Sequence, residues 1–343
     1  MMSDLDTEPV TLPKEARTYI NPVYPGYFAD PFAWEHEGVY YAIGTSAAEA
    51  AGTVDEVGER RVFPLLRSED FVTWEFAGNA LIRPDSALGN DFWAPEVAYS
   101  DGVFYLYYSV GHEDKQHQLR VAKSDRPLGP YQDLGESLLD LEAYPFAIDP
   151  HPFRDDDGQW YLFYACDFLD ADAEVRAGTA LMVDRLDGMT KLAGEATVVL
   201  RSRSDWQRFL KDRPMYGGIY DWHTLEGACV RKHGDLYYCF YSGGRWETEN
   251  YGVDYGVADS VMGPYSDAGN ETGARVLRSL PDRVLGPGHN SIVVGPDGQT
   301  EYIVYHAWDT SKTARRICLD KLIWTADGPR CNGPTWTVQT VFL

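Results

Sequence analysis

The chain has 343 residues, and its 53 acidic residues outnumber its 30 lysines and arginines to give a formal net charge of −23 at pH 7. This balance argues against a nucleic-acid partner, because phosphate binding needs clustered Lys and Arg. No apolar run approaches the roughly 18 residues that a membrane span requires, so we expect no membrane partner either.

The N-terminal residues 1–20 are polar and are predicted to form an arm or cap. They lack the basic start and apolar run of a secretory signal. We therefore expect a cytoplasmic protein, or a secreted one if a leader has been removed. The five cysteines show no metal-type spacing, and Cys166 and Cys239 lie within aromatic runs, where a thiol usually fills core space. This cysteine usage is typical of a reducing compartment.

Beyond residue 28, an aromatic-rich segment recurs five times, each time just after a glycine that follows a charged residue or a histidine. Each segment predicts a buried strand that follows a tight hairpin turn. The predicted strands are 39–43, 103–108, 160–164, 236–241 and 302–305. No long segment has helical periodicity, so the chain is predicted to be all-β.

The later part of each repeat also recurs. Residues 124–131 and 259–265 share a Gly-Pro-Tyr ending at similar distances after their glycines. A unit of about four strands that needs its neighbours to bury both faces is typical of a β-propeller. We predict a single domain over residues 1–343, a five-bladed β-propeller with blades of about four antiparallel strands. Residues 167–222 are interpreted as an insertion in the third blade, and residues 335–341 as the last strand.

Polar residues stand a few positions ahead of the hairpin glycines. Asp30, Glu96, Asp149 and Glu226 precede the first four glycines, and His289 precedes the fifth. The pattern is interpreted as one structural position that recurs in every repeat. The first strand of each propeller blade lines the central axis, so side chains at this position are expected to face one shared cavity.

Three of these acids, Asp30, Asp149 and Glu226, are embedded in apolar sequence. Taken singly, an Asp before Pro is a common turn former. Taken together, buried carboxylates are costly unless they are paired or used, and converging ones push their pKa values apart. Cleavage of a glycosidic bond needs one protonated and one ionised carboxyl, so the three acids are predicted to be catalytic. Glu96 is predicted to hold contacts between blades instead.

Five short motifs resemble those of glycoside hydrolase family 43, in the family's order and across residues 21–325. They are Ala29-Asp-Pro-Phe32, Phe92-Trp-Ala-Pro-Glu96, Ile148-Asp-Pro150, Leu225-Glu-Gly227 and Gly288-His-Asn290. The resemblance implies a five-bladed propeller and an inverting mechanism. At the matching positions it implies that Asp30 is the general base and Glu226 the general acid. Asp149 would orient the acid and tune its pKa.

The resemblance also implies three substrate-binding residues, Trp93, Arg315 and His289. Trp93 would offer its indole face to a sugar ring, and a core tryptophan is the alternative. Neighbours on a strand point to opposite faces, so only one of Arg315 and Arg316 can face the cavity, and Arg315 is chosen by the resemblance. In similar proteins the histidine that matches His289 lies near a bound calcium ion. The alternative is a hydrogen-bonded core histidine, since oxygen ligands dominate calcium sites. No organic cofactor is expected.

The remaining histidines are interpreted mostly as surface or packing residues: His36, His112, His117, His151, His233 and His306. Trp222 and His223 come shortly before Glu226 and are expected at the rim of the pocket. None of these residues is assigned a part in the chemistry.

We predict a glycosidase that releases pentose from fragments of plant cell-wall polysaccharide, foremost an α-L-arabinofuranosidase acting on arabinan or arabinoxylan oligosaccharides. The motifs around 287–291 and 305–308 favour arabinan-active members. A β-xylosidase and an endo-arabinanase stay open, because a fold does not fix a substrate. A carbohydrate-binding propeller without turnover and a protein-interaction propeller are alternatives of other classes. The sequence leaves the oligomeric state open.

Overall fold

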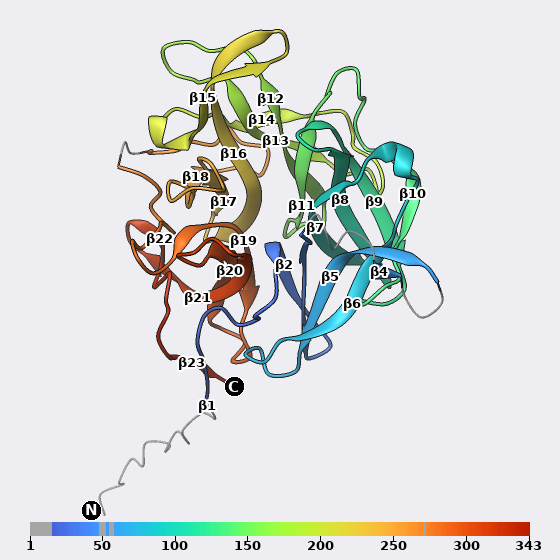
Figure 1. Ribbon diagram of the computed structural model, residues 1–343, viewed down its shortest axis with the longest axis vertical. Coiled ribbons are helices and arrows are strands. Elements are labelled where there is room, and N and C mark those ends of the chain that lie inside the picture. Colours follow the sequence, from blue (N-terminus) through green and yellow to red (C-terminus); the bar gives the residue numbers. More distant parts are fainter. Residues whose placement is uncertain (1–15, 48–52, 55–57, 270–271) are drawn as a thin grey trace, which may run out of the picture.

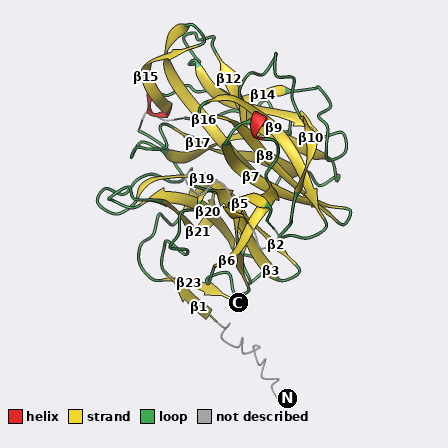
Figure 2. Ribbon diagram, turned by 45° about the vertical axis from the view of Figure 1, so that its right-hand side comes forward, coloured by secondary structure: helices red, strands yellow, loops and turns green. Residues whose placement is uncertain are grey.

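The computed structural model describes residues 16–47, 53–54, 58–269 and 272–343. Figures 1 and 2 show that these residues fold almost entirely into strands joined by turns and loops. The helical segments among them are two short 3₁₀ turns, η2 (Ser86–Leu88) and η3 (Asp205–Gln207). The prediction of an all-β chain is confirmed. None of the described segments is a helix long and apolar enough to cross a membrane.

The described strands form five sheets. The first sheet contains β2 (Ala29–His36), β3 (Val39–Thr45), β4 (Thr53–Val54), β5 (Arg60–Ser68) and β6 (Glu75–Ile82). The second contains β7 (Asp91–Ser100), β8 (Val103–His112), β9 (Lys115–Ser124) and β10 (Gln132–Ser137). The third contains β11 (Ala147–Arg154), β12 (Trp160–Phe168), β13 (Gly178–Arg185), β14 (Thr197–Leu200), β15 (Arg208–Met215), β16 (Gly218–His233), β17 (Leu236–Gly243) and β18 (Gly252–Ala258). The fourth contains β19 (Leu285–Val294), β20 (Glu301–Trp308), β21 (Arg315–Thr325) and β22 (Gly328–Cys331).

The two ends of the described chain make the fifth sheet. Strand β1 (Ala16–Tyr19) pairs antiparallel with β23 (Gln339–Phe342), as the lower part of Figure 1 shows. The predicted tail strand therefore begins later than residue 335, and it pairs with the start of the described chain. Residues 1–15 of the predicted arm lie outside the described residues.

All five predicted aromatic segments lie within observed strands, namely β3, β8, β12, β17 and β20. Each of these strands pairs antiparallel with the strand before it across the predicted hairpin. In the first two hairpins, Glu37–Gly38 and Asp101–Gly102 all have positive φ, the conformation of a type I′ turn. An added Cβ at Gly38 or Gly102 would meet no atom within 4 Å, so these turns require glycine for its backbone freedom.

Five strands, β2, β7, β11, β16 and β19, each open a hairpin and lie towards the middle of Figure 1. Each of these inner strands contacts the next along the chain, and β19 contacts β2, so the inner strands form a closed ring. Strand β13 also pairs in parallel with β16, which joins the third and fourth units into one sheet of eight strands. The predicted insertion, residues 167–222, is divided between these units, because β15 pairs with β16.

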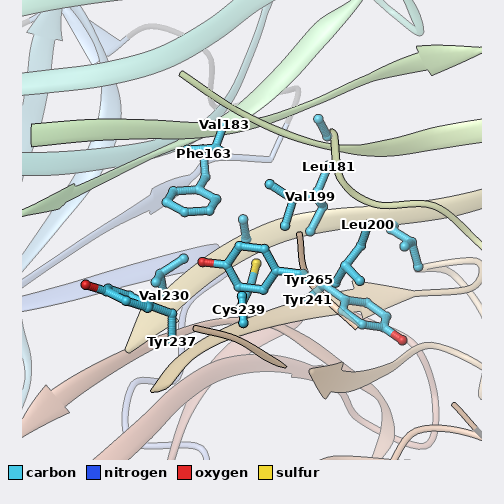
Figure 3. Close-up of a cluster of buried hydrophobic side chains, with 14 of the residues drawn as sticks. Phe163, Leu181, Val183, Val199, Leu200, Val230, Tyr237, Cys239, Tyr241 and Tyr265 are labelled. Carbon is cyan, nitrogen blue, oxygen red and sulfur yellow. The ribbon is translucent and has the colours of Figure 1, made fainter. Parts of the chain in front are cut away.

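Aromatic and aliphatic side chains fill the space between neighbouring units. Figure 3 shows one such core, in which Phe163 and Leu181 belong to the same cluster as Cys239 and Tyr241. The Cys239 side chain is completely buried there, and Cys166 is buried in the adjacent core, as predicted for thiols that fill core space. These cores hold the inner strands, and the side chains they carry, in fixed relative positions.

Candidate active site

Each inner strand is interrupted at the same place by a shift in register. A residue of positive φ, between 44° and 59°, lies at each break: Asp30, Ala94, Asp149, Gly227 and His289. A bulge of this kind bends the strand and re-aims a side chain. The predicted repeated position is therefore wrong for two acids. Glu226 comes one residue before Gly227, because this break lies seven residues ahead of its hairpin glycine against eight in the first unit. Glu96 comes two residues after Ala94, although that break lies eight residues ahead of its glycine, as in the first unit.

The bulges free backbone N–H groups from the strand ladder, and side chains of the neighbouring unit accept some of them. The N–H of Ala94 donates to Oγ1 of Thr45 at 2.9 Å. The N–H of His289 donates to Oγ of Ser242 at 2.6 Å. Thr45 and Ser242 occupy equivalent positions, since each pairs across its hairpin with the residue just before a bulge.

The other two known acceptors depart from this hydroxyl pattern. His306 is equivalent to Thr45, and its Nδ1 accepts the N–H of Asp30 at 3.1 Å. The equivalent residue in the third unit is Ala165, which has no side-chain acceptor. There the carboxylate of Asp149 accepts the N–H of Gly227 at 2.9 Å. In these two units the side chains of His306 and Asp149 thus accept the bulge N–H that a hydroxyl group accepts elsewhere.

One cavity of about 250 Å³ brings together the six residues predicted from the sequence. Its lining includes Asp30, Trp93, Asp149, Glu226, His289 and Arg315. These residues come from β2, β7, β11, β16, β19 and β21, so their meeting depends on the closure of the ring. Their roles in substrate binding and catalysis stay predictions.

Asp30 is held in its charged form by the groups around it. Arg315 donates from Nη1 to Oδ1 of Asp30 at 3.1 Å, and the Nδ1 atoms of His306 and His289 lie 3.3 and 3.5 Å from the same oxygen. Burial would raise the pKa of this carboxyl, but the positive charge of Arg315 holds it well below its usual value. Asp30 is therefore ionised at neutral pH, the form that a general base requires.

Glu226 and Asp149 show the opposite tendency. Burial raises the pKa of Glu226 to about 7 despite the hydroxyl of Tyr251, which donates to Oε1 at 2.7 Å. Burial also raises the pKa of Asp149 well above its usual value, and the negative charges of Glu226 and Asp30 add to this effect. Two carboxyls in such proximity do not both ionise readily, so the pair retains a proton at neutral pH.

His289 lies between the carboxyl groups of two of the acids. Its Nδ1 is 3.5 Å from Oδ1 of Asp30 and 3.9 Å from Oδ2 of Asp149. Burial lowers the pKa of this imidazole, which keeps the ring neutral at neutral pH. The ring packs against Gly227, where an added Cβ would lie 3.1 Å from it. His289 therefore separates the two acids without adding a positive charge.

Trp93 offers a supported aromatic face to the cavity. The ring of His117 stacks on it, with the ring centroids 3.8 Å apart and an interplanar angle of 23°. Burial lowers the pKa of His117 to about 4, so this supporting ring is neutral. A fixed indole face on a cavity wall suits the apolar face of a sugar ring.

Arg315 is nearly buried at the start of β21. It donates from Nε and Nη2 to the hydroxyl of Tyr27, at 3.1 and 2.8 Å, and its guanidinium lies 4.3 Å from the ring centroid of Trp246. Arg316 follows on the strand but pairs with Asp309 outside this cavity. Arg315 is thus positioned between Asp30 and two aromatic residues of the wall.

Sequence reasoning missed four residues that contact the acids or Arg315. Tyr27 and Trp246 line the cavity, while Tyr251 and His306 contact Glu226 and Asp30. The interpretation of His306 as a packing residue is incomplete, because the buried ring also touches an acid of the site. Its stretch, Tyr305-His-Ala-Trp308, already stands out in the sequence beside the family motifs and is the signal that could identify it.

Three residues near the motifs lie away from the cavity. Trp222 and His223 are both buried, and neither lines it, so their predicted place at the rim is wrong. Glu96 accepts a hydrogen bond from Nδ1 of His151 at 2.6 Å, and Nε2 of His151 accepts the N–H of Val230 at 2.9 Å. This buried chain ties β7, β11 and β16 together, which confirms that Glu96 holds contacts between units.

The surroundings of His289 do not match a calcium shell made of protein groups. The nearest carboxylates belong to Asp30 and Asp149, which are already bonded to Arg315 and to the N–H of Gly227. Calcium takes about six to eight oxygen ligands. Among the described residues, no group of three or more His, Cys, Asp or Glu side chains is arranged to hold a metal ion.

The cavity therefore combines an ionised carboxylate, a carboxyl pair that keeps a proton and a flat aromatic face. Hydrolysis of a glycosidic bond uses one protonated and one ionised carboxyl. The protonated carboxyl assists the leaving oxygen, and the ionised carboxyl activates water. The arrangement suits the cleavage of a bond between sugars.

Comparisons with known proteins agree with this chemistry. The profile described as Glycosyl hydrolases family 43 matches residues 19–329. The β-D-galactofuranosidase xynD of Aspergillus niger is 30% identical, over 90% of this chain and 83% of that protein. The extracellular exo-α-(1→5)-L-arabinofuranosidase ArbA of Cellvibrio japonicus is 26% identical, over 76% of this chain and 77% of that protein. The crystal structure of a thermostable family-43 glycoside hydrolase superposes with a TM-score of 0.77 at 29% identity, covering 94% of this chain and 98% of that one. Since the profile spans most of the chain and includes all three acids, the protein belongs to glycosyl hydrolases family 43 and is a glycoside hydrolase.

Proposed function

We propose that the protein is an inverting α-L-arabinofuranosidase that releases arabinose from arabinan or arabinoxylan oligosaccharides. The observation that carries this proposal is the contrast between two carboxyls of one cavity. Asp30 is kept ionised by Arg315, whereas Glu226 keeps its proton up to a pH of about 7. The name of the relative ArbA, an exo-acting arabinofuranosidase, supports the substrate class.

In the proposed reaction, Asp30 takes a proton from a water molecule as that water attacks the anomeric carbon. Glu226 gives its proton to the glycosidic oxygen as the bond between this oxygen and the anomeric carbon breaks. Asp149 and Glu226 oppose each other's ionisation, which supports one shared proton on the pair for Glu226 to donate. Inversion needs roughly 6.5–9.5 Å between the two carboxyls to admit the water. The position of β19 between β2 and β16 in the ring supports such a gap.

We also propose that the closed ring of inner strands is the centre of a five-bladed β-propeller and that residues 1–343 form one domain. The contacts from β2 around to β19 and back to β2 support the five blades. The pairing of β1 with β23 supports one domain, because it joins the two ends of the described chain.

A calcium ion near His289 stays a prediction from the family resemblance. Water molecules would have to supply most of its ligands, given the few protein oxygens near the ring. Elemental analysis of the purified protein tests this point, and a calcium content near zero that leaves activity intact would remove it.

A β-D-galactofuranosidase is the second candidate, because xynD, the relative with 30% identity, carries that name. A β-xylosidase or an endo-arabinanase also fits the family, since other relatives are named Xylosidase/arabinosidase 43A of Humicola insolens and extracellular endo-α-(1→5)-L-arabinanase 1 of Bacillus subtilis. These candidates share the carboxyl chemistry and differ in the sugar that the cavity accepts.

Hydrolysis of a substrate panel separates the candidates. The panel contains the nitrophenyl α-L-arabinofuranoside, β-D-xyloside and β-D-galactofuranoside together with arabino-oligosaccharides. We expect the arabinofuranoside to be cleaved best, with Asp30→Ala and Glu226→Ala each losing about 10³-fold on the oligosaccharides. Full activity of Asp30→Ala would remove the base assignment. NMR of the first-formed sugar tests inversion, and a product with retained anomeric configuration would overturn it. Binding of the sugars without any cleavage would leave only a carbohydrate-binding propeller.

A further inference from the structure

Glu226 and Asp30 touch two aromatic rings that are stacked on each other. The hydroxyl of Tyr251 donates to Oε1 of Glu226 at 2.7 Å. Nδ1 of His306 accepts the N–H of Asp30 at 3.1 Å and lies 3.3 Å from its Oδ1. The centroids of the Tyr251 and His306 rings are 5.8 Å apart, with an interplanar angle of 12°. One stacked pair therefore contacts both of the residues to which the reaction assigns a proton transfer.

The two rings are enclosed by protein. Tyr251 is 1% exposed and His306 is completely buried. Since Nδ1 of His306 accepts from Asp30, its single proton sits on Nε2, and this nitrogen has no hydrogen-bond partner among the described residues. Burial lowers the pKa of His306 to about 4, so the ring is neutral at neutral pH. Its position thus depends on the bond to Asp30 and on its packing against Tyr251.

Gly288 shows how closely the pair is packed. An added Cβ at this position would lie 2.1 Å from Cε1 of Tyr251, far inside contact distance. Gly288 also pairs with His306 across the hairpin of β19 and β20. A side chain at residue 288 would push Tyr251 away from Glu226. The glycine of the Gly288-His289-Asn290 motif is therefore required for space.

The other units show what is unusual about His306. At the equivalent positions, the hydroxyl groups of Thr45 and Ser242 accept the N–H of a bulge residue without any ring. An imidazole is thus not needed to satisfy the backbone. What the imidazole adds is a flat face for Tyr251.

We propose that Tyr251 and His306 form one positioning unit that sets the acid Glu226 and the base Asp30 relative to each other. This inference rests on the proposed roles of the two acids. Tyr251 fixes the carboxyl of Glu226 by a hydrogen bond, and its ring stacks on that of His306. His306 in turn accepts a hydrogen bond from the backbone N–H of Asp30. A substitution of either ring is therefore expected to displace both the acid and the base.

Several charged groups face Glu226, so the sign of a change at Tyr251 has to be derived among them. They are Asp30 on β2, Asp149 on β11, Arg315 on β21 and Glu247 in the loop before β18, with the neutral ring of His289 on β19. Asp30 and Glu247 raise the pKa of Glu226, whereas Arg315 and the hydroxyl of Tyr251 lower it. Removal of the hydroxyl alone leaves the other groups in place, and the pKa of Glu226 then rises.

The first test is Tyr251→Phe, which keeps the ring and removes the hydroxyl. On a substrate that the wild type cleaves, we expect kcat to fall about tenfold and the basic limb of the pH profile to move to higher pH. Tyr305→Phe is the matched control, because it removes an equally buried hydroxyl that donates to Asp320 at 2.6 Å. This control is expected to keep the wild-type pH profile. An unchanged rate and limb in Tyr251→Phe would overturn the proposal.

The second test is His306→Thr, which copies the hydroxyl found at residue 45. If the only function of His306 is to accept the backbone N–H of Asp30, this variant keeps full activity and the proposal fails. We expect instead that kcat falls about tenfold. The basic limb of the pH profile, which reports the pKa of Glu226, should also shift, although His306 does not hydrogen bond to Glu226. The double variant Tyr251→Phe/His306→Thr should lose little more than the worse single variant. Losses that multiply would show that the two rings act separately.

A wild type that cleaves none of the panel sugars would refute the proposed function and not the positioning unit. In that case the unit is tested by ¹³C NMR titration of the Glu226 carboxyl, identified by its absence in Glu226→Gln. The pKa of this carboxyl should rise in Tyr251→Phe and change in His306→Thr. A titration that neither variant changes would overturn the unit.

Discussion

The backbone N–H of Gly227 donates to Oδ2 of Asp149 at 2.9 Å, so a carboxylate on β11 holds the residue that follows Glu226 on β16. In two other units a hydroxyl group accepts the corresponding N–H. The third unit has Ala165 at the hydroxyl position, and Asp149 supplies the missing acceptor. Asp149 therefore has two separable effects on Glu226, one through this hydrogen bond and one through its charge.

Two substitutions of Asp149 separate these effects. Asp149→Asn removes the charge and keeps an oxygen that can accept from Gly227, whereas Asp149→Ala removes both. Loss of the negative charge makes ionisation of Glu226 easier, so the pKa of Glu226 falls and the basic limb of kcat/KM moves to lower pH in both variants. We expect about a tenfold loss of kcat in Asp149→Asn and about 10²–10³-fold in Asp149→Ala. Equal rates in the two variants would contradict a role for the hydrogen bond.

Arg315 is expected to set the acidic limb of the pH profile. Its positive charge lowers the pKa of Asp30, so Arg315→Ala raises that pKa and moves the acidic limb to higher pH. We expect kcat/KM near neutral pH to fall about 10²-fold, because the charge-assisted hydrogen bond to Asp30 is also lost. Arg316→Ala is the matched control on the same strand, and its profile should follow that of the wild type. An acidic limb that does not move in Arg315→Ala would refute the assignment of that limb to Asp30.

Glu226 is expected to make the fold less stable at high pH. Its pKa is about 7 in the folded protein against an ordinary value of 4.5. The folded state therefore keeps a proton that the unfolded chain has lost, and stability falls as the pH rises from 4.5 through 7. Glu226→Gln removes this titration and should raise Tm at pH 8 by roughly 2–4 °C relative to its effect at pH 4. Thermal unfolding at both pH values measures the difference, and an equal effect at the two values would contradict the raised pKa.

Glu96 is expected to matter for stability and little for catalysis. Glu96→Ala leaves the buried Nδ1 proton of His151 without its acceptor, which should lower the free energy of unfolding by about 2–3 kcal/mol. Glu96→Gln keeps an acceptor oxygen and should lose less. Denaturant unfolding gives these values, and kcat per folded molecule should stay close to that of the wild type. A loss of kcat as large as that of Glu226→Ala would place Glu96 in the chemistry.

The sequence by itself determined the five hairpins and the residue types of the site. Aromatic strands after turn glycines depend on neighbouring residues only, so their pattern is legible along the chain. The motifs around Asp30, Asp149 and Glu226 are equally local. The alternation of side chains along a strand likewise indicated that only one of Arg315 and Arg316 can face the cavity, without deciding which.

Only the tertiary structure decided which side chains meet and at what angle. Glu226 lies just before its bulge and Glu96 lies beyond its own, and the sequence does not mark where the strand pairing breaks. His306 became part of the site because the ring of inner strands closes and brings β20 beside β2. Tyr251 joined the site because the chain before β18 lies against both Glu226 and His306. Contacts between units arise only when the whole fold closes, so they cannot be predicted from a local sequence pattern.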